Sequence, residues 1–79
     1  MNDLKKQIKA ARAEAAQAER DYVRLQRRRD EIRARPTLTE ARRGRFIRRL
    51  DDDIARAHKR LTLAEMNLEG LTGDEGTES

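Results

Sequence analysis

Residues 4–32 read LKKQIKAARAEAAQAERDYVRLQRRRDEI, and residues 47–71 read IRRLDDDIARAHKRLTLAEMNLEGL. In both stretches mostly apolar residues recur at alternating steps of three and four, which keeps one narrow stripe of a helix against a partner helix. The first stripe is Leu4, Ile8, Ala11, Ala15, Ala18, Tyr22, Leu25, Arg29 and Ile32, and the second is Ile47, Leu50, Ile54, Ala57, Leu61, Ala64, Leu68 and Leu71. We call the two stripes together the seam. Its spacing predicts a coiled coil.

The two halves of the seam match each other when the chain folds back on itself. The pairs that this alignment predicts are Leu4–Leu71, Ile8–Leu68, Ala11–Ala64, Ala18–Ala57, Tyr22–Ile54 and Leu25–Leu50. Alanine then faces alanine in the middle, so we expect the helix axes to be closest there, with bulkier residues toward both ends. The predicted fold is all-α, a two-helix antiparallel coiled-coil hairpin.

Charged residues beside the seam are consistent with this register. In an antiparallel pair, flanking positions of the same kind meet across the seam. The alignment predicts three attractive pairs and one repulsive pair. The attractive pairs are Glu14–Arg60, Arg12–Glu65 and Glu19–His58, and the repulsive pair is Asp21–Asp53. An exposed ion pair contributes only about 0.2–1 kcal/mol, so these charges select the register more than they stabilise the fold.

Sequence signals for helix ends place the helices at about 3–34 and 38–69. Pro36 disfavours helical backbone at the preceding residue, which ends the first helix. Thr37 followed by Glu40 has the spacing of a capping box at the start of the second helix. Gly70 predicts a left-handed helix end, with Leu71 folded back toward Met66. Residues 1–71 would thus form the hairpin, with a basic turn near 35–37, and residues 72–79 an acidic tail.

A hairpin of this composition has little to bury. The chain has 79 residues, of which 35% are hydrophobic and 3% aromatic, and much of its seam is alanine. Chains of this size seldom gain enough from one core to be stable alone. We therefore expect a protein partner, either a second copy or a larger assembly. Off the seam, Phe46, Leu63 and Met66 are candidate protein contacts, although scattered exposed apolar residues are also normal on any protein.

Residues able to perform catalysis are nearly absent. The chain has no cysteine, one histidine (His58) and one serine (Ser79). His58 lies beside the seam, where a structural role is the simpler interpretation. Asp51, Asp52 and Asp53 are consecutive, so on a helix they point about 100° apart and cannot converge on one metal ion. We expect Asp52 to pair with Arg56 instead. The sequence predicts no enzyme activity, no cofactor, no metal site and no small-molecule substrate.

The sequence predicts neither secretion by a standard signal nor a membrane span. The amino terminus MNDLKKQIKA has no apolar segment typical of a signal peptide, and no apolar run approaches the length of a membrane span. We expect no membrane contact, and a location in the cytoplasm or within a particle assembled there.

Positive charge is concentrated around the predicted turn. Residues 24–49 contain eleven arginines and three acidic residues, whereas residues 50–79 contain three basic and eight acidic residues. Our candidates for contact with an anion, a nucleic acid or an acidic partner are Arg24, Arg27, Arg28, Arg33, Arg35, Arg42, Arg43, Arg45, Arg48 and Arg49. The eleventh arginine, Arg29, is on the seam. All are arginine rather than lysine, which favours bidentate contacts with phosphate or carboxylate.

Several of these arginines oppose local folding preferences. Arg42, Arg43 and Arg45 come early in the second helix, where positive charge opposes the helix dipole. Arg29 and Arg43 occupy seam positions. Such conflicts often mark functional sites. The alternative interpretation is that arginine stems cover the seam and keep the turn soluble.

Two functions agree with these features. The first is a non-enzymatic component of a larger assembly, a virion or a nucleoprotein particle, that docks its arginine-rich turn on an anionic surface. The second is a free homodimer that binds RNA or DNA without sequence preference, since the turn lacks the aromatic residues that stack on bases. Residues 46–61 resemble part of one helix of a small basic hairpin protein of the bacterial large ribosomal subunit. The turn and the arginine spacing differ, and we assign no family.

Overall fold

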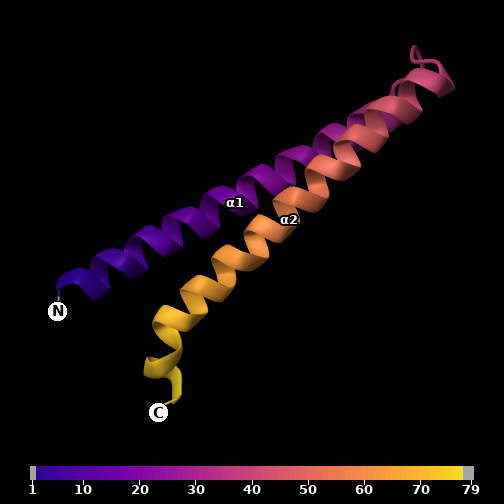
Figure 1. The fold of residues 1–79 in the computed structure, drawn as a ribbon. Helices are drawn as coiled ribbons and strands as arrows, with labels where there is room; N and C mark the ends of the chain where they lie inside the picture. The colour runs from indigo at the N-terminus through magenta and orange to yellow at the C-terminus, as the bar shows by residue number, and fades with distance from the viewer. Residues whose placement is uncertain (1, 78–79) are drawn as a thin grey trace.

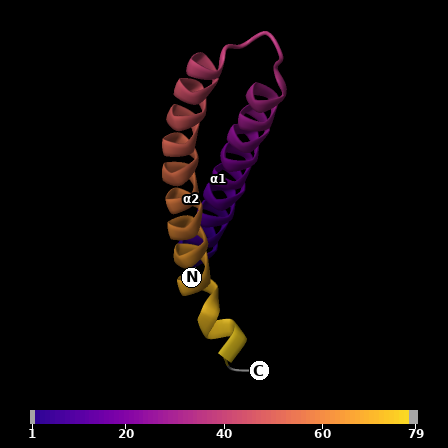
Figure 2. The ribbon, with the colours of Figure 1, turned by 90° about the vertical axis from the view of Figure 1, so that its right-hand side faces the viewer.

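Two long helices joined by a short turn make up the protein. The computed structural model describes the backbone of residues 2–77 and the side chains of residues 3–73. Helix α1 spans Asn2–Ala34 and helix α2 spans Glu40–Thr77. They run antiparallel, and residues 35–39 connect them at one end (Figures 1 and 2). The molecule measures 57 × 19 × 17 Å, which is the shape of a rod. The predicted helical hairpin is confirmed.

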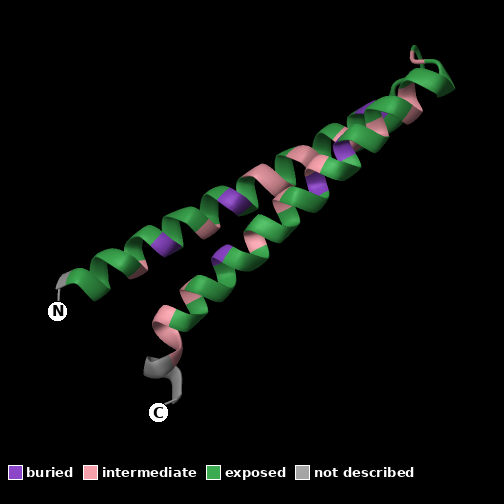
Figure 3. Ribbon diagram, in the orientation of Figure 1, coloured by how far each residue is buried: buried purple, intermediate pink, exposed green. Residues whose placement is uncertain are grey.

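The core follows the seam. The buried hydrophobic residues are Ala11, Ala18, Ile32, Leu50, Ile54 and Ala64, and all six belong to the predicted stripes. Buried positions lie on the sides of the two helices that face each other (Figure 3). Half of these core residues are alanine, so each brings the helices close while removing little apolar surface from water. The fold thus has a continuous but thin core.

Packing weakens toward the free ends of the helices. The helices overlap near the turn in Figure 1 and toward the free ends in Figure 2, so the two views together show a pair that twists along its length. Leu4, the first residue of the seam, is 47% exposed, and its predicted partner Leu71 is only partly buried. The seam is therefore least buried at its open end. The buried seam residues extend from Ala11 and Ala64 to Ile32 near the turn.

The helix boundaries at the turn are set by Pro36 and Thr39. The end of α1 at Ala34 agrees with the prediction, and the Arg35 backbone N–H still donates to the Ile32 carbonyl at 3.3 Å. The start of α2 was predicted two residues too early. The Thr39 hydroxyl accepts a hydrogen bond from the Arg42 N–H at 3.3 Å, so Thr39 and not Thr37 is the cap.

The end of α2 also differs from the prediction. The helix continues to Thr77 rather than ending near Glu69. Gly70 has no left-handed conformation, because no described glycine has a positive φ. Leu71 therefore extends the helix instead of folding back. Within the predicted acidic tail, residues 72–77 are helical, and Glu78 and Ser79 lie outside the described residues.

Ion pairs between the helices differ from those expected. Among the described side chains, none of the three predicted attractive pairs lies within ion-pair distance. Arg60 instead contacts Asp21 at 3.7 Å, and the His58 ring lies 5.5 Å from that of Tyr22. Arg56 pairs with Asp53 at 3.7 Å rather than with Asp52. Asp21 and Asp53, predicted to repel each other, each have an arginine partner. Arg60 thus contacts a carboxylate one heptad away from Glu14, its predicted partner.

Candidate anion-binding groove

Arg43 holds the turn together. Its Nη2 donates to the Arg35 carbonyl at 2.6 Å and to the Leu38 carbonyl at 3.2 Å. Backbone carbonyls near the end of a helix lack hydrogen-bond donors within that helix. A cationic side chain is well suited to donate hydrogen bonds to them. The second seam arginine, Arg29, is 25% exposed and contacts Asp51 on α2 at 3.2 Å. Each therefore has a contact within the fold, although the buried Nε atoms of both lack a partner.

A groove lies between the helices at the turn end. Its volume is about 660 Å³. The lining residues are Arg28, Glu31, Ile32, Arg35 and Leu38 from α1 and the turn, and Arg42, Arg45, Phe46, Arg49, Leu50 and Asp53 from α2. We call this the turn groove. Its lining contains five arginines and two carboxylates, which gives a net charge of +3.

Helical periodicity explains how the arginines converge. Arg42, Arg45 and Arg49 are three and four residues apart, so they share one side of α2. Arg28 and Arg35, seven residues apart, share the facing side of α1 and its extension into the turn. All five side chains are exposed. Among the described side chains, none of their guanidinium groups forms an ion pair. Their charge is available to a ligand.

The floor of the turn groove is apolar. Ile32 and Leu50 are buried core residues, and Leu38 is half-buried. Phe46 forms part of the lining and is 47% exposed. The arrangement combines guanidinium groups, which bind phosphate or carboxylate in a bidentate manner, with an apolar surface. A ligand that matches it would be anionic and would carry an apolar group.

The other predicted contact residues lie elsewhere. Arg24 and Arg27 lie with Arg20 along another face of α1, and Arg24 pairs with Asp21 at 2.8 Å. Arg33 and Arg48 are exposed but do not line the turn groove. Met66, 61% exposed, is also outside it. The basic turn end therefore has more than one surface, and only half of the ten predicted arginines share the groove.

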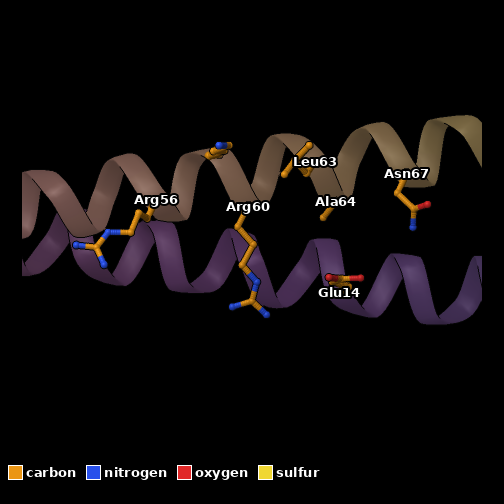
Figure 4. Close-up of a pocket in the computed structure, with 7 residues that line it drawn as sticks. Glu14, Arg56, Arg60, Leu63, Ala64 and Asn67 are labelled. Atoms are coloured by element: carbon orange, nitrogen blue, oxygen red, sulfur yellow. The ribbon is translucent and has the colours of Figure 1, made fainter.

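A second groove lies nearer the free ends. It has a volume of about 390 Å³ and is lined by Glu14 of α1 and by Arg56, Lys59, Arg60, Leu63, Ala64 and Asn67 of α2. We call this the distal groove. Arg60 extends from α2 across toward α1 (Figure 4). Leu63 is 56% exposed. Of these seven residues, only Leu63 was among the predicted contacts.

Heptad spacing in the sequence could have predicted the distal groove, because this groove continues the side of α2 that lines the turn groove. Positions Phe46, Asp53, Arg60 and Asn67 are seven residues apart, so they lie along one side of the coiled coil. Composition concealed this continuity, because the densest run of arginines ends at Arg49. Counting charges by segment showed that arginines gather at the turn, but it did not show which side of the hairpin they share.

Comparison with known proteins adds no further constraint. No protein-family model, curated protein or solved structure matches the chain. Within the residues that the structure describes, neither helix has a stretch that is long and apolar enough to cross a membrane. The same part of the chain contains no cluster of three or more histidine, aspartate or glutamate side chains arranged to hold a metal ion.

Proposed function

We propose that this chain is a non-enzymatic structural and interaction protein. It is a small helical-hairpin component of a larger assembly, a virion or a nucleoprotein particle, and it docks its arginine-rich turn on an anionic surface of that assembly. The observation that supports this proposal is the turn groove, where five exposed arginines surround an apolar floor and form no ion pair with any side chain of residues 3–73. Folding alone gives no reason to collect these five charges on one side.

The thin core supports the assembly part of the proposal. Six buried residues, half of them alanine, stabilise two helices of 33 and 38 residues. Helices in proteins obtain most of their stability from packing of an apolar face. An assembly that covers the hairpin would supply additional packing. Leu4, at the free end of the seam, is 47% exposed, so the hairpin alone supplies the least burial there.

Binding to anionic polymers across a salt series tests the proposal. The probes are random-sequence RNA, random-sequence DNA and polyglutamate, each labelled for fluorescence anisotropy. The double variant Arg42→Gln/Arg49→Gln removes two groove charges, and Arg33→Gln/Arg48→Gln is the matched control outside the turn groove. We expect the groove variant to weaken binding about tenfold more than the control, which corresponds to about 1.4 kcal/mol. Affinity should fall as salt rises. Equal loss in the two variants would contradict a role for the groove.

Sedimentation of the purified chain separates the two functions considered above. An assembly component should show incomplete folding or weak self-association when isolated. A stable soluble dimer whose binding to nucleic acid depends steeply on salt would instead support the free nucleic-acid-binding protein. That result would contradict the assembly role.

A further inference from the structure

The turn groove and the distal groove belong to one continuous track. On α2, the residues that line them follow steps of four and three from residue 42 to residue 67. The stripe includes Arg42, Phe46, Arg49, Arg56, Arg60 and Leu63. Asp53 lines the turn groove and contacts Arg56, which lines the distal groove, at 3.7 Å. The two grooves therefore meet at this ion pair. At a rise of about 1.5 Å per residue, the stripe is roughly 38 Å long.

The facing wall comes from α1 at regular intervals. Glu14 lines the distal groove, and Arg28 and Arg35 line the turn groove. Asp21 lies between them in the sequence and contacts Arg60 at 3.7 Å. These four residues are seven apart, which keeps them on one side of the hairpin. The track thus has the heptad geometry of a site for a third helix.

We propose that an acidic amphipathic helix of a partner protein occupies this track and completes a three-helix coiled coil. This inference rests on the proposed function and names the chemistry of the partner. Phe46 and Leu63 are the apolar anchors of the track, and they are 47% and 56% exposed. They are 17 positions apart, roughly 25 Å along α2. Arginines occupy the positions between and beside them, so the partner carries carboxylates flanking its apolar stripe.

Charge and shape favour a helix over the other possible occupants. The carboxylates of Glu14, Asp21 and Asp53 interrupt the positive charge of the track. A peptide helix can place uncharged side chains opposite them, whereas a nucleic acid carries a phosphate at every nucleotide and would find one aromatic side chain, Phe46, on which to stack. A second copy of the chain offers no matching acidic stripe among residues 3–73. Its densest acidic run, Asp51 to Asp53, points around α2 rather than along one side.

A designed peptide tests the inference. The probe is a synthetic four-heptad peptide with leucine at the a and d positions and glutamate at e and g, compared with a scrambled peptide of the same composition and with random-sequence single-stranded RNA. Because the chain has no cysteine, one cysteine introduced at a chosen position can carry a single label. We expect the full-length protein to bind the heptad peptide about tenfold more tightly than the scrambled one. Binding should follow a one-to-one stoichiometry.

Matched variants locate the contact. Leu63→Ala removes an anchor in the track, and Val23→Ala removes an exposed apolar residue beside Arg20 and Arg27, on the opposite side of α1. Both residues are exposed, so we expect helicity measured by circular dichroism to stay unchanged. Leu63→Ala should weaken binding of the heptad peptide about fivefold to tenfold, which is typical of an interface anchor, and Val23→Ala should leave it unaltered.

Three outcomes would overturn the inference. One is equal affinity for the heptad and scrambled peptides, and another is equal loss in the Leu63→Ala and Val23→Ala variants. The third is RNA binding that is tighter than peptide binding and insensitive to Leu63→Ala. In all three, arginine-dependent binding of an anionic polymer would leave the proposed function standing. Failure to bind the peptides, RNA and polyglutamate would contradict both.

Discussion

Replacement of Arg43 by glutamine should destabilise the hairpin, although the residue opposes the dipole of α2. The guanidinium donates two hydrogen bonds to carbonyls of the turn. Hydrogen bonds that involve a charged group contribute about 1.5–3 kcal/mol each when they are buried, but only one of these is partly buried, and water can replace the other. We therefore assign about 2–3 kcal/mol to the pair.

Two effects reduce this value. Removing a positive charge from the first turn of a helix stabilises it by about 0.3–1 kcal/mol. The Arg43 Nε is buried without a partner, and glutamine removes that cost too. The net loss for Arg43→Gln is then about 1–2 kcal/mol, equivalent to a decrease in Tm of roughly 4–16 °C for a domain of this size. Glutamine is too short to reach both carbonyls.

Thermal unfolding followed by circular dichroism at several protein concentrations measures this change. Arg42→Gln is the matched control, because its guanidinium forms no ion pair among the described side chains. Its Tm should stay constant or rise slightly through the dipole effect. If Arg43→Gln were as stable as the control or more stable, the assignment of Arg43 to the turn would be wrong. Arg43 would then again be a candidate residue of the anion-binding surface.

Three further substitutions test local features of the fold by urea or thermal unfolding. Gly70→Ala should stabilise the protein by about 0.5–1 kcal/mol, because Gly70 is helical and an added Cβ meets nothing within 4 Å; destabilisation would indicate the left-handed end of α2 instead. Gly44→Ala should have the same effect for the same reason, and a lower Tm would contradict helical backbone there. Asp51→Asn should destabilise the hairpin by about 0.5–1 kcal/mol, since it leaves Arg29 without its ion-pair partner at the seam. Asp52→Asn is its control, and equal effects would show that the ion pair contributes nothing.

Most of the fold could be predicted because the seam depends on many residues at once. A shift of register would expose Ile32, Leu50 and Ile54 together, so the periodic pattern allows only one register of the two helices. The helix ends depend on single residues, whose contributions are near 1 kcal/mol and compete. Thr37 and Thr39 can each cap a helix, and the turn after Pro36 extends far enough that the second of them does so.

The candidate site was predicted less completely. The arginines could be assigned to the turn end, but their assignment to one side required the actual helix boundaries and the supercoil. Side-chain partners were the least predictable, as Arg60 shows: it was predicted to pair with Glu14 and instead contacts Asp21, one heptad away on α1. One feature of the sequence indicates that Arg43 binds the carbonyls of the turn. A cation on the first turn of α2 faces the end of α1, where backbone carbonyls need donors.

The most direct test of the docking track is NMR on the labelled full-length chain titrated with the acidic heptad peptide. Amide shifts should change along the stripe of α2 that carries Arg42, Phe46, Arg49, Arg56 and Leu63, and along the facing side of α1. The opposite side of α1, around Arg20 and Arg27, should be unaffected. Shifts that are confined to that opposite side, or are spread evenly over both helices, would contradict a docking site in the grooves.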